Sequence, residues 1–336
     1  IQIDTDCSAI YSQQTIDQFN FSNKWFKKGN LYFFDFDSNG YKEIYFYSYS
    51  QDSLFIQGLD PYFYGGIFLE KFLYRLNFYN EEPDLVSANL KLFDIDLNND
   101  GYKEIVGDVM AGFTAEPRFV FTFDIKGKKV LNIKNSPMYI QINDTLNVPN
   151  NIMFSTSSYA PGNLNDSIAD KTEYSDHSAW SVIFDNNLQY YFPPIETEGM
   201  TSGVTTYFNK ENDRVYLYSL ERPPRGAPYN YLTKYSIEGK LIKSKKIQNT
   251  LDRCQIYKKQ MNNAMRIFLL ERQNNELFQI NEELELEKIS TLNKSRLVFI
   301  DLNNDRNHEV INWESGENDA YLYSDGFSDP ATIKTE

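Results

Sequence analysis

Three stretches of the chain decide its fold, because each places an acidic loop between two apolar runs. They read LYFFDFDSNGYKEIYF at Leu31–Phe46, LKLFDIDLNNDGYKEIV at Leu90–Val106 and LVFIDLNNDRNHEVI at Leu297–Ile311. The loops themselves begin at Asp35, Asp96 and Asp301. Aromatic and β-branched residues precede and follow each loop, which is typical of strands. Each stretch therefore predicts two strands of one sheet joined by an acidic loop.

The spacing of these loops indicates an internal repeat. Asp35 and Asp96 are 61 residues apart, and Asp301 follows 205 residues later, room for roughly four units of about fifty residues. Weaker units between them keep the strands and lose the acids, so we expect repeats to start near residues 29, 88, 138, 200, 253 and 296. One repeat cannot bury its own apolar face, and a closed ring of repeats can. The prediction is all-β: a β-propeller of six to seven four-stranded blades, with residues 1–336 as a single domain.

The composition agrees with sheet and excludes two classes of partner. Aromatic residues make up 16% of the chain, with 25 Tyr and 25 Phe, and both types favour strands. The net charge is −14, and the densest basic stretch, Lys240–Lys246, fits the exposed face of a strand, so we expect no nucleic acid partner. No run reaches the roughly 18 apolar residues of a membrane span. The chain begins without Met or a leader, so we expect a mature or excised domain.

The acidic loops fit a calcium site. Positions 1, 3, 5 and 9 offer side-chain oxygens, position 7 offers a backbone carbonyl, and a Gly at position 6 permits the sharp turn. Each loop carries three negative charges that repel one another unless a cation lies between them. The ligands expected in the three loops are Asp35, Asp37, Asn39, Tyr41 and Glu43; Asp96, Asn98, Asp100, Tyr102 and Glu104; and Asp301, Asn303, Asp305, Asn307 and Glu309.

Other interpretations of these loops stay open. An EF-hand requires a bidentate Glu at position 12, where this chain has Phe46, Gly107 or Asn312, so EF-hands are excluded. An Asx-rich turn without metal remains an alternative for each loop. In the third loop Arg306 replaces the Gly, so that loop is either a weak site or no site. Gly162–Asp170 is either an eroded copy of the loop or an ordinary surface loop.

The loop pattern resembles the FG-GAP/VCBS repeats of integrin-type β-propellers. The shared features are nine Asp- and Asn-rich residues that end in an acid, followed by Ile or Val, between two strands. The match is specific in the loops at Asp35 and Asp96, and weaker at Asp301. The resemblance implies calcium bound at the residues named above, blades braced by that calcium, and a propeller that presents a surface to a ligand.

Little in the sequence points to catalysis. The two histidines are His177, in a context better explained by packing, and His308, inside the third loop. No nucleophile elbow, phosphate-binding glycine loop or Cys/His zinc spacing occurs. Two Tyr-rich loops, at residues 60–66 and 221–231, form either a surface for a glycan or a peptide or protein ligand, or caps on the blades. Their candidate ligand-binding residues are Tyr62, Tyr64, Arg222, Arg225 and Tyr229.

We therefore expect a ligand-binding or sensor module more than an enzyme, located in a secreted, periplasmic or cell-surface setting. Two alternatives remain: a calcium-dependent polysaccharide lyase or glycosidase, and a secreted adhesion module. Cys7 and Cys254 either form a disulfide or are two buried thiols. Two segments are ambiguous in secondary structure. Gly66–Tyr79 fits a helix or one or two strands, and Asn281–Lys288 has helical composition but follows a strand as a hairpin return would.

Overall fold

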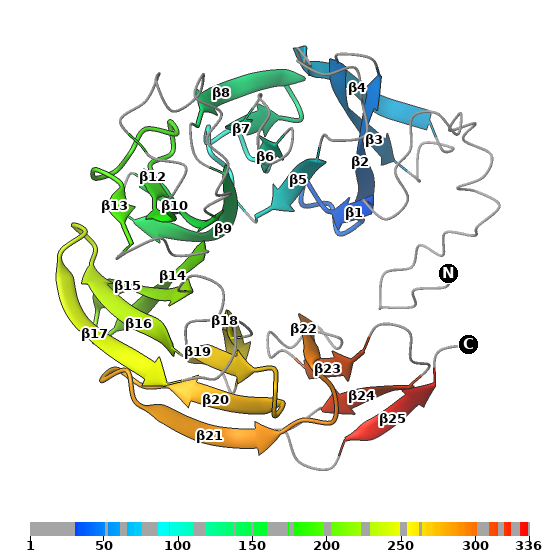
Figure 1. The fold of residues 1–336 in the computed structure, drawn as a ribbon. Coiled ribbons are helices and arrows are strands. Elements are labelled where there is room, and N and C mark those ends of the chain that lie inside the picture. The colour runs from blue at the N-terminus through cyan, green and yellow to red at the C-terminus, as the bar shows by residue number, and fades with distance from the viewer. Residues whose placement is uncertain are drawn as a thin grey trace. The chain divides into compact units, whose positions relative to one another are not determined.

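A computed structural model describes residues 31–50, 53–60, 66–75, 87–93, 95–110, 118–136, 139–148, 151–159, 174, 178–197, 203–222, 229–248, 254–261, 264–300, 309–314, 319–323 and 330–334. Within these residues every regular element is a β-strand and there is no helix (Figure 1). The predicted all-β fold is confirmed. The described part of the chain thus contains no helix long and apolar enough to span a membrane. The strands divide between two compact units, called unit 1 and unit 2 below.

Unit 1 contains two four-stranded antiparallel sheets whose strands follow the order of the chain. The first consists of β1 (Leu31–Phe34), β2 (Glu43–Ser50), β3 (Ser53–Asp60) and β4 (Gly66–Arg75). The second consists of β5 (Ser87–Leu92), β6 (Ile105–Met110), β7 (Arg118–Asp124) and β8 (Lys129–Asn135). β9 (Tyr139–Val148) pairs with β10 (Asn151–Tyr159), and β12 (Ile183–Phe184) is next to β10 in the sheet order. β9 also packs against β5, β6 and β7.

Unit 2 contains three four-strand meanders, each antiparallel and in chain order. The first consists of β14 (Gly203–Glu211), β15 (Arg214–Arg222), β16 (Tyr229–Ser236) and β17 (Leu241–Gln248). The second consists of β18 (Cys254–Met261), β19 (Ala264–Glu271), β20 (Glu276–Ile280) and β21 (Leu286–Thr291). The third consists of β22 (Arg296–Ile300), β23 (Glu309–Trp313), β24 (Asp319–Tyr323) and β25 (Ala331–Lys334). The end of β10 pairs with β14, and β11 (Trp180–Ser181) pairs with β13 (Ile195–Glu196).

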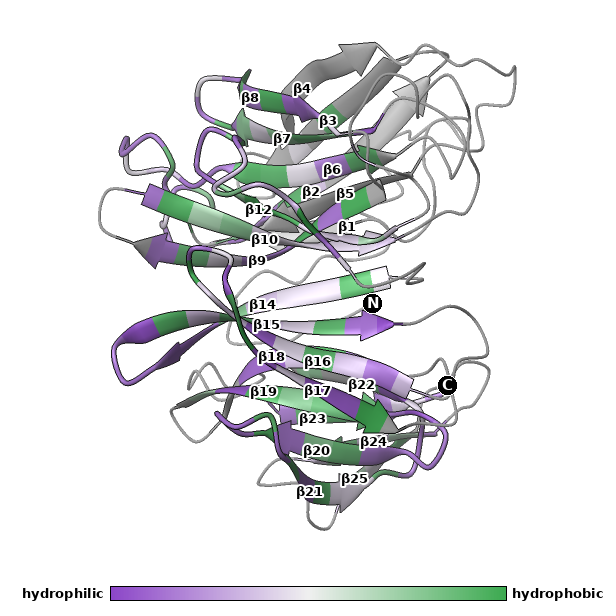
Figure 2. Cartoon of the chain, turned by 60° about the vertical axis from the view of Figure 1, so that its left-hand side comes forward, coloured by the Kyte–Doolittle hydropathy of each residue, from purple (hydrophilic) through white to green (hydrophobic). Residues whose placement is uncertain are grey.

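The apolar run in β19 shows why sequence alternation is weak in this fold. Successive side chains of a strand point to opposite faces of the sheet. Ile267 and Leu269 pack with residues of β15, β16 and β18, whereas Phe268 and Leu270 pack with residues of β22 and β23. Both faces of this sheet are therefore buried, so both sets of positions must be apolar. In Figure 2, β19 is coloured mostly green, which marks hydrophobic residues.

Two hairpins of unit 2 have the same turn geometry. In residues 236–240, between β16 and β17, the N–H of Gly239 donates to the carbonyl of Ser236 at 3.0 Å. In residues 281–285, between β20 and β21, the N–H of Leu284 donates to the carbonyl of Asn281 at 3.0 Å. Gly239 and Leu284 both have positive φ, of 81° and 59°. The segment with helical composition is therefore a turn followed by β21.

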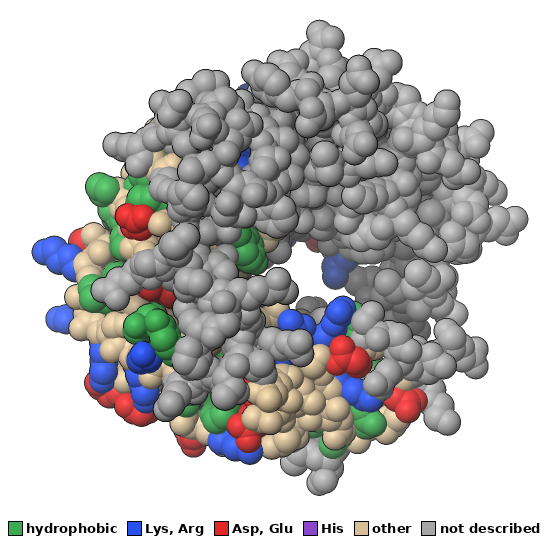
Figure 3. Space-filling model, viewed as in Figure 1, with side chains coloured by type: hydrophobic (Ala, Val, Ile, Leu, Met, Phe, Trp, Pro, Cys, Tyr) green, Lys and Arg blue, Asp and Glu red, His purple; other side chains and the backbone are tan. Residues whose placement is uncertain are grey.

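Charged side chains of both signs are mixed on the described surface (Figure 3). The basic stretch lies in and just before β17, where Lys243 and Lys245 form ion pairs with Glu283 and Glu285 of the neighbouring turn. Cys254 is buried at the start of β18. Cys7 lies outside the described residues, so the predicted choice between a disulfide and two thiols stays open.

Candidate metal centre

Two of the three acidic loops lie in unit 1, at the same position in their sheets. The first runs from Asp35 to Glu43 and joins β1 to β2, in which Phe34 pairs with Glu43. The second runs from Asp96 to Glu104 and joins β5 to β6. The apolar residues before and after each loop favour strands, and the loop reverses the chain between these two adjacent strands. Each loop thus joins two paired strands of one sheet, as expected from the sequence.

The two loops have the same internal hydrogen bonds. The side chain at position 1 accepts the backbone N–H groups of positions 5 and 6. Position 3 accepts the N–H of position 5, position 5 that of position 7, and position 9 that of position 2. In the first loop the donor–acceptor pairs are Asn39 N to Asp35 Oδ1, Asn39 N to Asp37 Oδ1, Gly40 N to Asp35 Oδ2, Tyr41 N to Asn39 Oδ1 and Phe36 N to Glu43 Oε2. In the second they are Asp100 N to Asp96 Oδ1, Asp100 N to Asn98 Oδ1, Gly101 N to Asp96 Oδ2, Tyr102 N to Asp100 Oδ1 and Leu97 N to Glu104 Oε2.

The backbone conformations of the loops also match. Position 4 is left-handed in both, with φ of 59° at Ser38 and 58° at Asn99. Position 6 is left-handed as well, with φ of 92° at Gly40 and 86° at Gly101. Left-handed backbone is costly for most residues and easy for glycine, which explains the Gly at position 6. The shared turn brings the carboxylates at the start and the end of the second loop close together, whereas the acids of the first loop, which are also among the described residues, do not form a comparable group.

Glu104 is the most informative side chain of the second loop. It is 1% exposed, and its Oε2 accepts the N–H of Leu97 at 2.5 Å. Its Oε1 is buried and has no hydrogen-bond partner. The pKa of Glu104 is raised to about 7, chiefly by burial; the negative charges of Asp96, Asp100 and Asp124 contribute in the same direction, and the hydrogen bond from Leu97 acts against them. A buried carboxylate oxygen without a partner beside other carboxylates is unfavourable unless a cation or a proton is bound.

The second loop has the donor set of a hard-cation site. Carboxylate oxygens of Asp96, Asp100 and Glu104 lie within 4.8 Å of one another. Among the described residues these three form the one such group of acidic or metal-ligating side chains. Oxygen donors in this number fit calcium or magnesium, and they do not fit zinc or copper, which prefer nitrogen and sulfur. The ammonium of Lys126 lies 3.8 Å from Asp100 Oδ2, at the rim of this acidic group.

The first and second loops touch each other. The N–H of Lys103 donates to the carbonyl of Phe36 at 2.8 Å, which joins position 8 of the second loop to position 2 of the first. The ring of Phe36 lies 5.7 Å from the ring of Tyr102, measured between centroids. The sequence did not predict this contact, because it depends on how two neighbouring sheets pack.

The remaining predicted site residues divide between described and undescribed segments. Of the third loop, Glu309 begins β23 and is buried, whereas Asp301, Asn303, Asp305 and Asn307 lie outside the described residues. Tyr62, Tyr64, Arg225, His177 and His308 also lie outside them. Arg222 ends β15 and Tyr229 begins β16, on either side of an undescribed loop. Tyr229 packs against Tyr231, with 5.4 Å between ring centroids, and the ammonium of Lys246 lies 3.7 Å from the Tyr229 ring.

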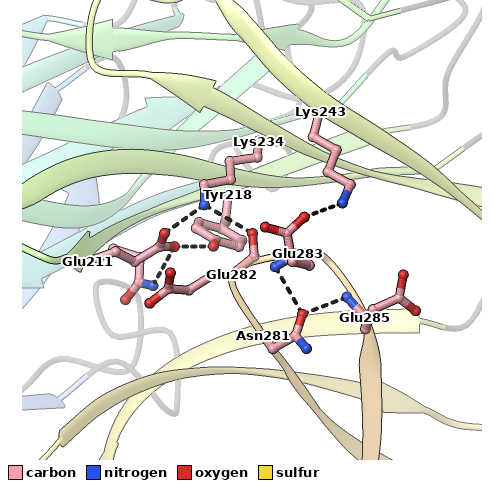
Figure 4. A network of polar contacts seen from close by, with 9 residues as sticks. Glu211, Tyr218, Lys234, Lys243, Asn281, Glu282, Glu283 and Glu285 are labelled. Atoms are coloured by element: carbon pink, nitrogen blue, oxygen red, sulfur yellow. Dashed lines mark hydrogen bonds and ion pairs between the residues drawn. The ribbon is translucent and has the colours of Figure 1, made fainter.

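Unit 2 holds a buried polar cluster that the sequence did not reveal (Figure 4). Lys234 of β16 donates to Glu211 Oε2 of β14 at 2.6 Å and to the carbonyl of Glu282 at 3.0 Å. The hydroxyl of Tyr218 on β15 donates to the other oxygen of Glu211. The Lys234 ammonium and the Glu211 carboxylate are paired, and the bond to the Glu282 carbonyl joins one meander to the β20–β21 turn of the next. The cluster therefore has a structural role: it links two neighbouring meanders of unit 2.

Comparison with known proteins identifies no family for the chain. No family model and no curated protein sequence matches the chain. Among solved structures it is similar to one reported in a structural and mechanistic analysis of two prolyl endopeptidases, at 8% sequence identity and a TM-score of 0.48. The match covers 91% of this chain and 42% of that one, so the chain spans less than half the length of that protein.

Proposed function

We propose that the chain is a calcium-stabilised β-propeller that works outside the cytoplasm as a ligand-binding or sensor module. The observation that carries the calcium part is the buried Oε1 of Glu104, which has no hydrogen-bond partner and lies beside Asp96 and Asp100. In this proposal Asp96, Asn98, Asp100 and Glu104 hold the ion with side-chain oxygens, and Tyr102 holds it with its carbonyl. The first loop, with the same hydrogen bonds and the same left-handed residues, holds a second ion.

The arrangement of strands supports the propeller part of the proposal. Four-strand meanders begin at Leu31, Ser87, Gly203, Cys254 and Arg296. The repeats in the sequence are expected to start near 29, 88, 138, 200, 253 and 296. Near 138 the structure describes the paired strands β9 and β10 in place of a separate four-strand meander. Within unit 2, the meander that begins at Cys254 packs against both of its neighbours through opposite faces. Sheets that bury both faces in this way are the building blocks of propellers.

Calcium in this proposal is structural. All of its ligands come from one short loop, and no side chain of the described loops marks an open position for a substrate. An ion that binds the folded protein and not the unfolded chain stabilises the fold by an amount set by its concentration over its dissociation constant. At the two loops the ion would offset the repulsion among three carboxylates, and so hold β1 to β2 and β5 to β6.

The ligand-binding part of the proposal rests on the segment around Tyr229. Its ring packs against Tyr231 and under Lys246, so aromatic faces and a cation meet at the start of β16. Tyrosines that present a ring and a hydroxyl suit glycans and peptides. A glycan and peptide screen of the calcium-loaded protein tests this part. Binding that Tyr229→Ala weakens would support it, and a hit that Tyr229→Ala leaves unchanged would move the ligand site elsewhere.

Calcium titration tests the metal part. Isothermal calorimetry should show saturable calcium binding, and thermal unfolding should show a higher unfolding midpoint. At a calcium concentration one hundred times the dissociation constant, the free energy of unfolding should increase by about 2.7 kcal/mol. Asp96→Asn with Asp100→Asn should remove the binding of one ion. Asp213→Asn is the control, because Asp213 is exposed and pairs with Lys210 in the β14–β15 hairpin of unit 2. Absence of calcium binding in the unaltered protein, with no metal found after purification, would reject the proposal.

A further inference from the structure

We propose that the two loops bind calcium cooperatively, and that Phe36 of the first loop is the positioning residue that couples them. This inference rests on the proposed calcium sites. It starts from one peptide group, the one between Tyr102 and Lys103. The carbonyl of that group is the backbone ligand expected at position 7 of the second loop. The N–H of the same group is the one that donates to the carbonyl of Phe36 at 2.8 Å.

That hydrogen bond fixes the orientation of the carbonyl ligand. A peptide group is planar, so holding its N–H in one direction holds its C=O in the opposite direction. A peptide group whose N–H donates a hydrogen bond also becomes a stronger donor of electron density at its oxygen, because neighbouring hydrogen bonds polarise one another. Phe36 therefore both aims the Tyr102 carbonyl and strengthens it as a ligand.

Phe36 is itself held by a metal ligand of its own loop. Its N–H donates to Oε2 of Glu43 at 3.2 Å, and Glu43 is the acid at position 9 of the first loop. An ion in the first loop would draw the Glu43 carboxylate into one arrangement and so restrain Phe36. The ring of Phe36, 5.7 Å from that of Tyr102, adds a side-chain contact along the same path. The path thus runs from Glu43 through Phe36 to the Tyr102 carbonyl.

The sign of the coupling follows from this path. Calcium binding in the first loop orders Phe36, so less conformational entropy remains to be lost when the second loop binds its ion. The second loop therefore binds calcium more tightly. By linkage, binding in the second loop must strengthen binding in the first by the same factor. Two calcium ions in neighbouring loops also repel each other, and that repulsion has the opposite sign. The sign of the measured coupling therefore decides between the two effects.

The experiment measures calcium affinity in variants that keep one loop at a time. All proteins carry Asp301→Asn with Asp305→Asn, so that the third loop does not contribute. Asp35→Asn with Asp37→Asn disables the first loop and leaves Glu43 and Phe36 intact. Asp96→Asn with Asp100→Asn disables the second. Calorimetry with calcium chloride then gives the dissociation constant of each loop alone, and of both together. A protein with all three loops disabled is the blank.

We expect the second loop to bind at least about five-fold more weakly when the first is disabled, and the first to lose the same factor when the second is disabled. Equal affinities in the presence and absence of the other loop would overturn the coupling and leave the calcium proposal standing. Tighter binding by a single loop would also overturn it, in favour of ion–ion repulsion. No calcium binding in the unaltered protein would reject the calcium sites themselves, and the coupling with them.

A backbone change tests Phe36 directly. Replacing the amide N–H of Lys103 by an ester oxygen, through nonsense suppression or semisynthesis, removes the hydrogen bond to Phe36 and keeps every side chain. The ester also weakens the Tyr102 carbonyl as a ligand, but it does so whether or not the first loop is intact. The ratio of the second loop's affinity with the first loop intact to its affinity with the first loop disabled cancels that effect. The ratio should fall to about one in the ester protein, and an unchanged ratio would exclude the Phe36 path.

Discussion

The ammonium of Lys234 lies 2.6 Å from Oε2 of Glu211, and the two side chains are 8% and 6% exposed. This buried ion pair is completed by neutral partners. Tyr218 donates to the second oxygen of Glu211, and the carbonyl of Glu282 accepts from Lys234. Desolvation of Tyr218, with the nearby Glu211 carboxylate, raises the pKa of its phenol above the ordinary value, so Tyr218 remains a donor. Each member of the cluster therefore depends on the others.

Removing one charge of this pair should cost far more than removing both. Lys234→Met leaves the Glu211 carboxylate buried without its cation, which should lower the free energy of unfolding by about 3–5 kcal/mol. Lys234→Met with Glu211→Leu should recover much of that loss, because no unpaired charge remains. Urea denaturation measures both. As a control, Lys243→Met opens a solvent-exposed pair with Glu283 and should change stability little. A double variant as unstable as Lys234→Met would contradict this account.

The calcium-free protein should lose stability as the pH rises from about 4.5 to 7. The pKa of Glu104 is about 7 in the folded state and 4.5 in the unfolded chain. The folded protein then binds more protons than the unfolded chain in this window, so unfolding becomes easier as the pH increases. Full ionisation should cost on the order of 3–4 kcal/mol.

Chemical denaturation of the chelator-treated protein at several pH values measures this loss, and Glu104→Gln should remove most of it. Glu196→Gln is a suitable control, since Glu196 accepts from Ser178 in an exposed position of unit 2. A pH dependence that Glu104→Gln leaves intact would assign the titration to other groups.

Two glycines with similar φ should respond differently to alanine. Gly101 has φ of 86° and open space where a Cβ would lie, so Gly101→Ala should cost about 1 kcal/mol of conformational strain. Gly239 has φ of 81°, and a Cβ there would lie 2.8 Å from Cδ2 of Phe192. Gly239→Ala should therefore destabilise more than Gly101→Ala. Thermal unfolding of the two variants in chelator compares them, and equal losses would show that the Phe192 ring moves away without cost.

Both faces of β19 should be equally sensitive to truncation. Leu269 and Leu270 point to opposite sides of the sheet, and both are almost fully buried. Leu269→Ala and Leu270→Ala should each lower the free energy of unfolding by about 2–5 kcal/mol. Met265, at the start of the same strand, is 48% exposed, so Met265→Ala serves as the control and should change stability little. A small effect at either leucine would mean that its face of the sheet is not part of a packed core.

The strands and the turns of the acidic loops could be predicted because their signals are local. Asp35–Glu43 and Asp96–Glu104 lie between apolar runs, and a nine-residue pattern specifies its own turn through contacts within the loop. The segment after Asn281 was ambiguous because NEELE has helical composition, yet an Asx turn there reverses the chain: Asn281 Oδ1 accepts the N–H groups of Glu283 and Glu285. The choice for Gly66–Tyr79 was likewise open, and residues 66–75 form β4.

The contacts between sheets could not be predicted, because they depend on packing. Lys234 stands among alternating polar and aromatic residues of β16, where a strand pattern places lysine on the surface. It is buried because Glu211 and the Glu282 carbonyl surround it. The contact between Phe36 and Lys103 has the same origin, since it joins residues far apart in sequence that neighbouring sheets bring together. Orphan atoms such as Oε1 of Glu104 also appear only once the fold is known.

The hydrogen bonds inside the two loops have a consequence for timing. The N–H groups of positions 5, 6 and 7 already hold the carboxylates and the amide oxygens in a turn, with no ion bound. An arriving ion therefore finds the turn already formed, and the ordering that remains is confined to local movements of the ligand groups and of Phe36, without a slow rearrangement of the backbone. The rates of calcium binding and release would then be set by the exchange of water molecules around the ion. The occupancy of the loops would therefore follow changes in calcium concentration almost without delay.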